Sequence, residues 1–299
     1  MVKPILKWAG GKRQLLEDIE SLFPKDYKSH SFHEPMFGGG AVTFRIEPQE
    51  GTINDINSRL MRFYEVVKNK PEELIDENRS HSYKNEEDDF YEARKEFNRP
   101  VRGEELDKVR EASLLIYLNR NCFNGLYREN SNGKFNVPFG DYSNPDWVRK
   151  EQIRNCSKVL QKLEILNDDF KYILEKTDAD DLVYFDPPYQ PVSETADFTQ
   201  YSKEDFDFEE QKRLRDTCIK LHEKGVFFVL SNSWAKPVRE LYEKVEEFEI
   251  NRVSANRDIS SNADTRGPVY EILVTNIPVD LQRGKNQKKL HKFTENLES

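Results

Sequence analysis

The stretch LVYFDPPYQP, residues 182–191, decides the fold and points to one site. Its first four residues are apolar or aromatic and predict a buried strand. Pro187 and Pro188 end that strand, because proline has no backbone N–H and a fixed φ angle. The segment after the strand is therefore rich in acceptors and poor in donors: it offers carbonyl oxygens, the carboxylate of Asp186 and the ring of Tyr189. We interpret it as a site that accepts hydrogen bonds.

Strand-like and helix-like runs alternate along most of the chain. We predict strands at 31–34, 51–54, 163–166, 182–185, 226–231 and 269–275, and helices at 11–22, 41–46, 56–68, 205–223 and 237–245. This alternation predicts an α/β fold with a mostly parallel sheet. Between 60 and 160 no long strand is apparent, and residues 104–120 space their apolar side chains as a helix face does. We expect an inserted helical domain there.

Composition narrows the class of protein. The 299 residues, 36% of them hydrophobic, are enough for an ordinary core. No apolar run approaches the roughly 18 residues of a membrane span, and the N-terminus lacks a signal-peptide pattern, so we expect a cytoplasmic protein without a membrane partner. Cys122, Cys156 and Cys218 are far apart and form no metal-ligand cluster with histidines, so neither disulfides nor a metal are expected. The net charge of −9 disfavours nucleic-acid binding over the whole surface but leaves room for a local basic site.

A second motif, HEPMFGGGAVTF at 33–44, places three consecutive glycines before a helical run. Such glycines let a backbone approach a ligand at a helix N-terminus, although a turn that needs positive φ explains them equally well. Asp55 closes the next strand, about where an acidic side chain holds ribose hydroxyls in doubly wound folds. The dinucleotide fingerprint fails at its sixth position, Thr43 counted from Gly38, which favours an adenosine-containing ligand other than NAD.

Eight motifs in order resemble the Dam-type DNA adenine N6-methyltransferases, of the D12 class and alpha group, and most closely their GATC-recognising members. They are KWAGGK (7–12), EPMFGGGA (34–41), NDIN (54–57), NCFNGLYR (121–128), GKFNVPFGDY (133–142), NDDF (167–170), DPPY (186–189) and LSNS (230–233). The resemblance implies a Rossmann-like S-adenosylmethionine-dependent methyltransferase fold. We expect a catalytic domain at 1–60 and 155–280, a helical target-recognition domain at 61–154 with a β-hairpin near 119–142, and a flexible tail at 281–299.

The resemblance also implies the reaction, in which S-adenosylmethionine methylates N6 of adenine in double-stranded DNA and leaves S-adenosylhomocysteine, with no metal. The adenine amine is a poor nucleophile because its lone pair is delocalised into the ring. Acceptors for both amine hydrogens favour the tetrahedral geometry that the attack needs. Asp186 and the Pro187 carbonyl are expected to supply these acceptors, and Tyr189 to stack on a base flipped out of the duplex.

Further residues take roles by resemblance. The residues expected to bind the methyl donor are Trp8, Lys12, Phe37, Gly38, Gly40, Asp55, Asp169, Phe170 and Asp186. In the predicted hairpin, Phe123 and Asn124 are expected to wedge into the base stack and fill the vacated place, while Leu126, Arg128 and Pro138 read base edges. Lys7 matches a base-contacting lysine. The cluster Asn130-Ser131-Asn132-Gly133 predicts the hairpin turn between arms that carry Tyr127, Phe135 and Phe139, and a core hairpin without DNA contacts is the alternative.

Three other functions stay open at this point. A non-catalytic DNA-binding module needs no Asp186 or glycine loop, and an NAD-dependent oxidoreductase needs the fingerprint that fails at Thr43. An adenine methyltransferase acting on RNA would flip a similar base. One complete site per chain makes a monomer adequate for the chemistry.

Overall fold

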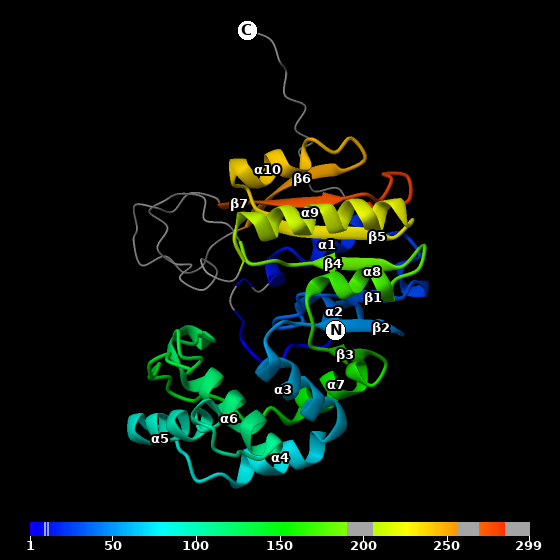
Figure 1. The fold of residues 1–299 in the computed structure, drawn as a ribbon. Coiled ribbons are helices and arrows are strands. Elements are labelled where there is room, and N and C mark those ends of the chain that lie inside the picture. Colours follow the sequence, from blue (N-terminus) through cyan, green and yellow to red (C-terminus); the bar gives the residue numbers. More distant parts are fainter. Residues whose placement is uncertain (9, 11, 190–205, 256–268, 285–299) are drawn as a thin grey trace. The chain divides into compact units, whose positions relative to one another are not determined.

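The computed structural model describes residues 1–8, 10, 12–189, 206–255 and 269–284. Within these residues the strands form one mixed sheet in the order β3-β2-β1-β4-β5-β7-β6 (Figure 1). Their bounds are Phe32–Glu34 (β1), Gly51–Asn54 (β2), Glu164–Leu166 (β3), Leu182–Phe185 (β4), Phe227–Ser233 (β5), Glu249–Ala255 (β6) and Val269–Thr275 (β7). The α/β class expected from the sequence is confirmed.

The strand directions determine the edge of the sheet at which functional side chains can lie together. The pairs β1–β4, β4–β5 and β2–β3 are parallel, whereas β7 is antiparallel to both β5 and β6. In the register Val183 lies opposite His33 on one side and Phe228 on the other. Because parallel strands end at the same edge, the segment that begins at Asp186 follows the carboxyl end of β4, the edge at which open α/β sheets bind ligands.

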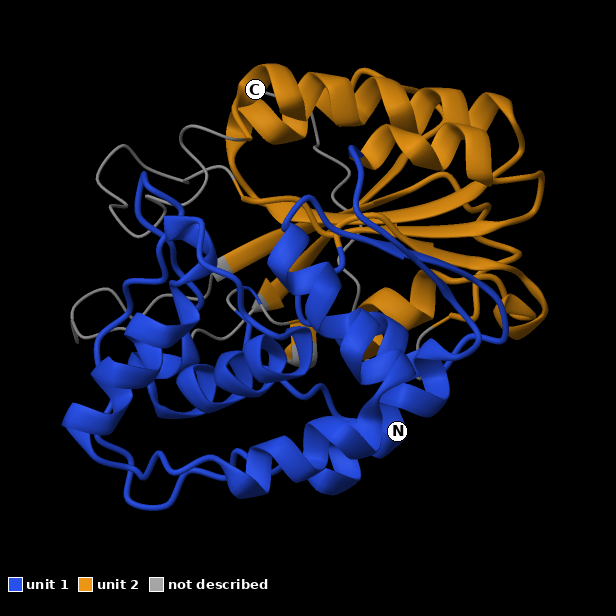
Figure 2. Cartoon of the chain, turned by 60° about the horizontal axis from the view of Figure 1, so that its bottom comes forward, with its two compact units in different colours: residues 1–11, 37–169 blue, residues 12–36, 170–299 orange. Residues whose placement is uncertain are grey.

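The chain divides into two compact units, shown in different colours in Figure 2. The first unit, residues 1–11 and 37–169, holds β2, β3 and a group of helices. These are α2 (Ala41–Ile46), α3 (Ser58–Asn69), α4 (Pro71–Ser80), α5 (Glu87–Phe97), α6 (Lys108–Asn121) and α7 (Lys150–Leu160), with the 3-10 turns η3 (Pro100–Arg102) and η4 (Phe123–Gly125). Caps explain where two of the helices begin, since the Asn57 side chain accepts from Leu60 N and that of Asp107 from Val109 N. The domain boundaries expected from the sequence stay a prediction.

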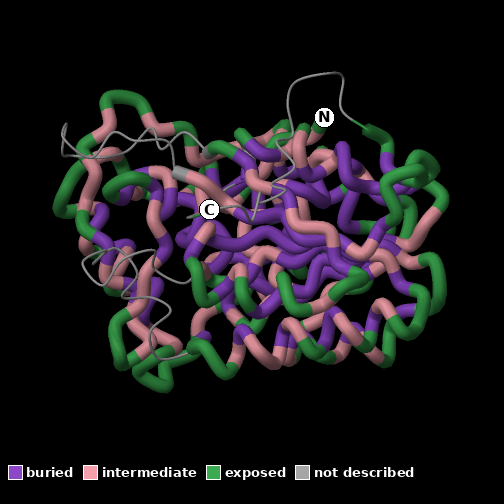
Figure 3. The backbone as a smooth tube through the Cα atoms, turned by 90° about the horizontal axis from the view of Figure 1, so that it is seen from above, coloured by how far each residue is buried: buried purple, intermediate pink, exposed green. Residues whose placement is uncertain are grey.

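The second unit, residues 12–36 and 170–299, holds β1 and β4 to β7. Its helices are α1 (Leu16–Leu22), α8 (Ile173–Lys176), α9 (Phe208–Glu223) and α10 (Lys236–Tyr242), with the 3-10 turns η1 (Lys12–Gln14), η2 (Tyr27–Ser29) and η5 (Phe170–Tyr172). All four residues of β4 are buried, as are all of β5 except the half-buried Phe227. Figure 3 colours the described backbone by burial. A strand covered on both faces explains the continuous apolar run at 182–185.

Strand β6 falls where we predicted no strand. Its sequence, EINRVSA, mixes Glu249, Asn251 and Arg252 with the apolar Ile250 and Val253 and so lacks a strong strand pattern. It pairs with β7 alone and ends the strand order, a position in which polar side chains are tolerated. Helix α7 lies in the region expected to be helical, although we predicted no individual helix at these residues.

The three cysteines are free thiols buried in the hydrophobic cores. Burial raises the pKa of the Cys122 thiol to about 12. It also raises the pKa values of Cys156 and Cys218. Among the described residues, no helix is both long enough and apolar enough to cross a bilayer. Most of the predicted tail, residues 285–299, lies outside the described residues.

Candidate active site

The carboxylate of Asp186 is held from one side. Its Oδ1 atom lies 2.9 Å from Lys12 Nζ and accepts a hydrogen bond from Ser231 Oγ at 3.1 Å. The side chain of Lys12 is only 5% exposed and that of Asp186 24% exposed. Within the described part of the chain, the structure records no partner for Oδ2. This second oxygen is therefore the one available to an incoming hydrogen-bond donor.

Burial raises the pKa of Asp186, while Lys12 and the Ser231 hydroxyl act against that effect. Ser231 is itself fully buried in β5, and the hydroxyls of Ser231 and Tyr184 are hydrogen-bonded at 2.9 Å. The pair orients the Ser231 hydroxyl toward Asp186. Neither residue was among the predicted site residues, although Ser231 belongs to the LSNS motif. Lys12, expected to bind the methyl donor, contacts the carboxylate of Asp186.

The turn after Asp186 is fixed by buried amides. The Pro188 carbonyl accepts from Gln211 Nε2 at 3.1 Å, and Gln211 Oε1 accepts from Asn232 Nδ2 at 2.9 Å. Gln211 and Asn232 are both fully buried. The Pro187 carbonyl receives no hydrogen bond from the residues that the structure describes. The arrangement leaves Pro187 O and Asp186 Oδ2 as neighbouring acceptors on a rigid turn.

Tyr189 is anchored through its hydroxyl, which donates to Glu271 Oε2 at 2.6 Å. Lys12 Nζ lies 4.4 Å from the centre of the Tyr189 ring, a cation–π contact. Burial and the nearby carboxylates raise the pKa of Tyr189, so the phenol stays protonated at neutral pH. Glu271 was not predicted as a site residue, and its position in the middle of β7 offered no sequence signal.

In the first unit, the glycine loop has the positive φ angles that one of the two sequence interpretations requires. Gly38 (φ +49°) and Gly40 (φ +67°) have left-handed backbones. A Cβ on Gly38 would also lie 2.8 Å from Trp8 Nε1, so the loop passes directly over this indole. The Phe37 ring is 2% exposed and packs edge-on against Tyr64 at 4.7 Å.

Asp55 closes the glycine loop. Its Oδ2 accepts from Gly38 N at 2.9 Å and its Oδ1 from Asn57 N at 2.9 Å. Burial raises the pKa of Asp55, and these two backbone N–H groups oppose the rise. A carboxylate has about four acceptor sites, so two remain for a ligand. The sequence analysis considered the glycine loop and Asp55 together, and the structure joins them by the hydrogen bond from Gly38 N.

Two asparagines that we did not predict hold the segment before Asp169 beside this strand end. Asn54 Oδ1 accepts from Asp168 N at 2.7 Å, and Asn167 Nδ2 donates to Asp55 O at 2.7 Å. Both asparagines belong to motifs quoted above, NDIN and NDDF.

In the second unit, Phe170 is 6% exposed and its ring packs against Phe206 at 6.1 Å.

Residues 122–139 fold back on themselves. Antiparallel bridges pair Cys122 with Phe139 and Glu129 with Phe135, and Gly133 N donates to Asn130 O in the turn between them. Phe123 is 53% exposed, and Asn124 beside it has φ +54°. The other aromatic side chains of the two arms are less accessible. Tyr127 and Phe135 are buried in the core and Phe139 is packed against it, which fits the alternative in which these arms pack in the core.

The predicted base-reading residues of this segment differ in exposure. Pro138 is exposed, whereas Leu126 and Arg128 are half-buried. Arg128 Nε donates to Asn136 Oδ1 at 2.7 Å, which holds the guanidinium across the two arms. Lys7 Nζ lies 4.6 Å from the Tyr142 ring centre.

The backbone of Lys7 is fixed by Asn119, a residue that sequence reasoning missed. Asn119 Oδ1 accepts from Lys7 N at 2.8 Å, and its Nδ2 donates to Lys7 O at 2.9 Å and to Gly125 O at 3.0 Å. This 1% exposed amide therefore joins the KWAGGK segment to the NCFNGLYR segment.

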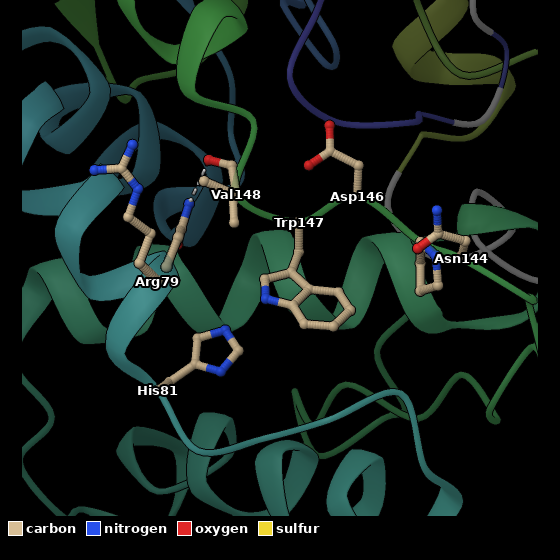
Figure 4. A pocket seen from close by; sticks show the side chains of 8 residues that line it. Arg79, His81, Asn144, Asp146, Trp147 and Val148 are labelled. Carbon is tan, nitrogen blue, oxygen red and sulfur yellow. Dashed lines mark hydrogen bonds between the residues drawn. The ribbon is translucent and has the colours of Figure 1, made fainter.

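A hollow of about 380 Å³ lies elsewhere in the first unit (Figure 4). It lies between the end of α4 and residues 144–148, and the rings of His81 and Trp147 are stacked 6.0 Å apart beside it. None of the predicted site residues lines it. We give it no part in the active site.

An α/β sheet whose central strand ends in Asp-Pro-Pro-Tyr, together with a glycine loop closed by a strand-end aspartate, defines an enzyme of the methyltransferase class. The D12 class N6 adenine-specific DNA methyltransferases match residues 8–259, and the chain belongs to this family. It is an adenine-specific DNA methyltransferase. The DNA-binding module, the oxidoreductase and the RNA enzyme considered above are thereby set aside.

Curated relatives agree with this assignment. The type II methyltransferase M1.LlaDCHI of Lactococcus lactis subsp. cremoris is 42% identical over 277 residues, covering 92% of this chain and 95% of the relative. The type II methyltransferase M.MjaIII of Methanocaldococcus jannaschii is 40% identical over 291 residues, covering 92% and 99%. The DNA adenine methylase of Escherichia coli K12 is 35% identical over 273 residues, covering 91% and 94%.

Proposed function

We propose that this enzyme methylates N6 of adenine in the duplex sequence GATC, with S-adenosylmethionine as the methyl donor and the target base flipped out of the helix. The observation that carries the proposal is the pair of acceptors at the end of β4, Asp186 Oδ2 and Pro187 O, to which no group in the described part of the chain donates. The family supports adenine in DNA as the substrate and implies the donor. The NCFNGLYR resemblance supports GATC.

The first unit carries groups that fit the adenosine part of the donor. Asp55 keeps acceptor sites for ribose hydroxyls after it has bound Gly38 N and Asn57 N. Without a Cβ, Gly38 can approach the Trp8 indole and Gly40 can approach the rings of Phe37 and Phe44. We assign donor binding to these residues together with Lys12, Phe37, Asp169, Phe170 and Asp186, as the family motifs imply. When bound, S-adenosylmethionine supplies a methyl group already activated on a sulfonium sulfur.

The chain's own part in the chemistry is to align and polarise the adenine amine. Asp186 Oδ2 accepts one amine hydrogen and the Pro187 carbonyl accepts the other, so the lone pair of N6 leaves conjugation with the ring. Lys12 and Ser231 hold Oδ1, which leaves Oδ2 without freedom to rotate away. Asp186 must be ionised to accept, and the Lys12 ammonium favours that form.

Tyr189 offers an aromatic face to the flipped base, and its bond to Glu271 fixes the ring in place before the base arrives. In the DNA-reading segment, residues 122–139, the exposed Phe123 suits a wedge that opens the base stack, with Asn124 beside it. Leu126, Arg128 and Pro138 are assigned to base edges, and Lys7 to a base contact.

The deciding experiment measures transfer of a labelled methyl group from S-adenosylmethionine to a GATC duplex, its single-base variants and an RNA duplex of the same sequence. Wild type is expected to prefer GATC DNA, and Asp186→Ala to lose on the order of 10²-fold or more in rate while donor binding stays. Asp181→Ala is the matched control, because Asp181 precedes β4, at the opposite end from Asp186, and pairs with His33. Equal activity of wild type and Asp186→Ala would refute the mechanism. A preference for another DNA sequence would refute GATC alone.

A further inference from the structure

Tyr127 is placed between two functional segments of the first unit. Its ring stacks on Trp8, with centroids 5.2 Å apart and planes at 21°. Its hydroxyl donates to Glu129 Oε1. Tyr127 is 8% exposed, so nearly all of its surface packs against the protein. Any effect that it has on binding must act through these neighbours.

On the ring side, the contact leads to the glycine loop. A Cβ built on Gly38 would lie 2.8 Å from Trp8 Nε1, and one on Gly39 would lie 2.8 Å from Trp8 Cβ. Trp8 therefore contacts both the glycine loop and Tyr127. Asn57 lies near the Tyr127 hydroxyl, whose pKa its side chain lowers, and its backbone N–H donates to Asp55 Oδ1 at 2.9 Å. The position of Tyr127 is therefore coupled to the groups assigned to the adenosine moiety.

On the hydroxyl side, the contact leads to the DNA-reading segment. Glu129 is bridged to Phe135 on the opposite arm and lies 3.7 Å from Arg59 Nη1. Arg59 is held in turn by Glu111, whose Oε1 accepts from Arg59 Nε at 3.0 Å. Arg59 on α3 and Glu111 on α6 therefore fix the position of Glu129. The Tyr127 hydroxyl donates to this fixed carboxylate.

Arg128 lies between Tyr127 and Glu129 in sequence. Successive side chains of an extended segment point to opposite sides. When Tyr127 and Glu129 face each other on the buried side, Arg128 is directed to the other side, where Asn136 holds its guanidinium. A shift of Tyr127 would move the arginine assigned to guanine.

We propose that Tyr127 is a positioning residue that couples binding of the methyl donor to reading of the DNA sequence. The inference rests on the proposed function of the glycine loop and Arg128. Its prediction is thermodynamic: donor and GATC duplex each raise the affinity for the other by the same factor, α, and Tyr127 carries a measurable part of α.

Calorimetry measures α with S-adenosylhomocysteine, which cannot react, titrated into the enzyme with and without a GATC duplex. Wild type is expected to give α of about 5 to 150. Tyr127→Phe keeps the stacked ring and loses the hydroxyl, and is expected to lower α roughly 3- to 10-fold, the equivalent of one hydrogen bond. Glu129→Ala removes the acceptor from the other side and is expected to lower α similarly, which keeps the test decisive if Tyr127→Phe does not fold.

Tyr64→Phe is the matched control. Tyr64 is also a buried tyrosine against the glycine loop, but its hydroxyl donates to Gly38 O at 3.1 Å, a bond to the loop itself. Its loss is expected to weaken donor binding equally with and without DNA, so that α is unchanged. A wild-type α in Tyr127→Phe, or the same loss of α in Tyr64→Phe, would overturn the proposal. Wild type that binds both ligands with α of 1 would also overturn it, whereas wild type that binds neither would instead refute the proposed function.

Discussion

Replacement of Arg128 by alanine is expected to relax the choice among DNA sites more than it slows methylation overall. Guanine presents two acceptors, O6 and N7, on its major-groove edge, and a guanidinium can bind both at once. The assignment of Arg128 to a guanine of GATC therefore predicts a loss of discrimination at one base position.

The structure sets the size of this effect. A guanidinium carries five N–H donors. Arg128 uses its Nε–H on Asn136 Oδ1 at 2.7 Å and one Nη2–H on Asn136 O at 3.4 Å. About three donors remain, enough for one bidentate contact. Such a contact contributes about 1–3 kcal/mol of discrimination. At about 1.4 kcal/mol per factor of ten, this corresponds to roughly 5- to 150-fold in relative rate.

The assay compares methylation rates on GATC and on each single-base variant for wild type and Arg128→Ala. Arg102→Ala is the control, since Arg102 is an arginine of the same unit paired with Glu104 at 2.8 Å and outside the DNA-reading set. Loss of activity by one factor on all sites would show that Arg128 binds phosphate, and that result would also reduce the salt dependence by about one unit of slope. Unchanged preference and rate in Arg128→Ala would refute any DNA contact.

Asp55→Ala is expected to weaken S-adenosylhomocysteine binding about tenfold or more, because a charged acceptor is lost from the ribose site, and calorimetry showing unchanged affinity would contradict this. Burial raises the pKa of Asp186, and only its carboxylate accepts the amine hydrogen, so single-turnover rates are expected to fall as pH decreases through a midpoint above the ordinary value near 3.8. Ser231→Ala removes a hydrogen bond that lowers this pKa and is expected to move the midpoint further up, whereas a downward move would contradict the assignment. Gly38→Ala is expected to reduce the free energy of unfolding by about 1–3 kcal/mol, because an L residue is strained at φ +49° and its Cβ meets Trp8, and thermal unfolding measures the loss.

The fold could be predicted where burial leaves a simple pattern. Strand β4 is buried along its length, so its apolar run and the prolines after it mark both ends. Strand β6 has one neighbouring strand and carries polar side chains, so its sequence did not distinguish it from a loop. Such a strand forms because it pairs with another segment of the chain. The local sequence pattern carries no information about that partner.

Local sequence patterns also revealed some residues of the candidate active site and missed others. Asp55 and the glycine loop were associated by their spacing, and the structure joins Asp55 to Gly38. Side chains that act over a long sequence separation had no such signal. Glu271 meets Tyr189 from 82 residues away, and Asn119 meets Lys7 from 112 residues away. The sequence placed Tyr127 on a hairpin arm but could not decide its role, because an aromatic ring suits stacking on bases as well as packing in a core.

The buried thiols make the enzyme convenient for site-directed labelling. A maleimide reacts with a thiolate, and the raised pKa values of Cys122, Cys156 and Cys218 keep these groups protonated and out of reach at neutral pH. A single cysteine introduced at exposed Ser131, in the turn of the DNA-reading segment, would therefore take up a fluorophore selectively without removal of the natural cysteines. Such a probe would report base flipping and site search in real time on an otherwise unaltered protein.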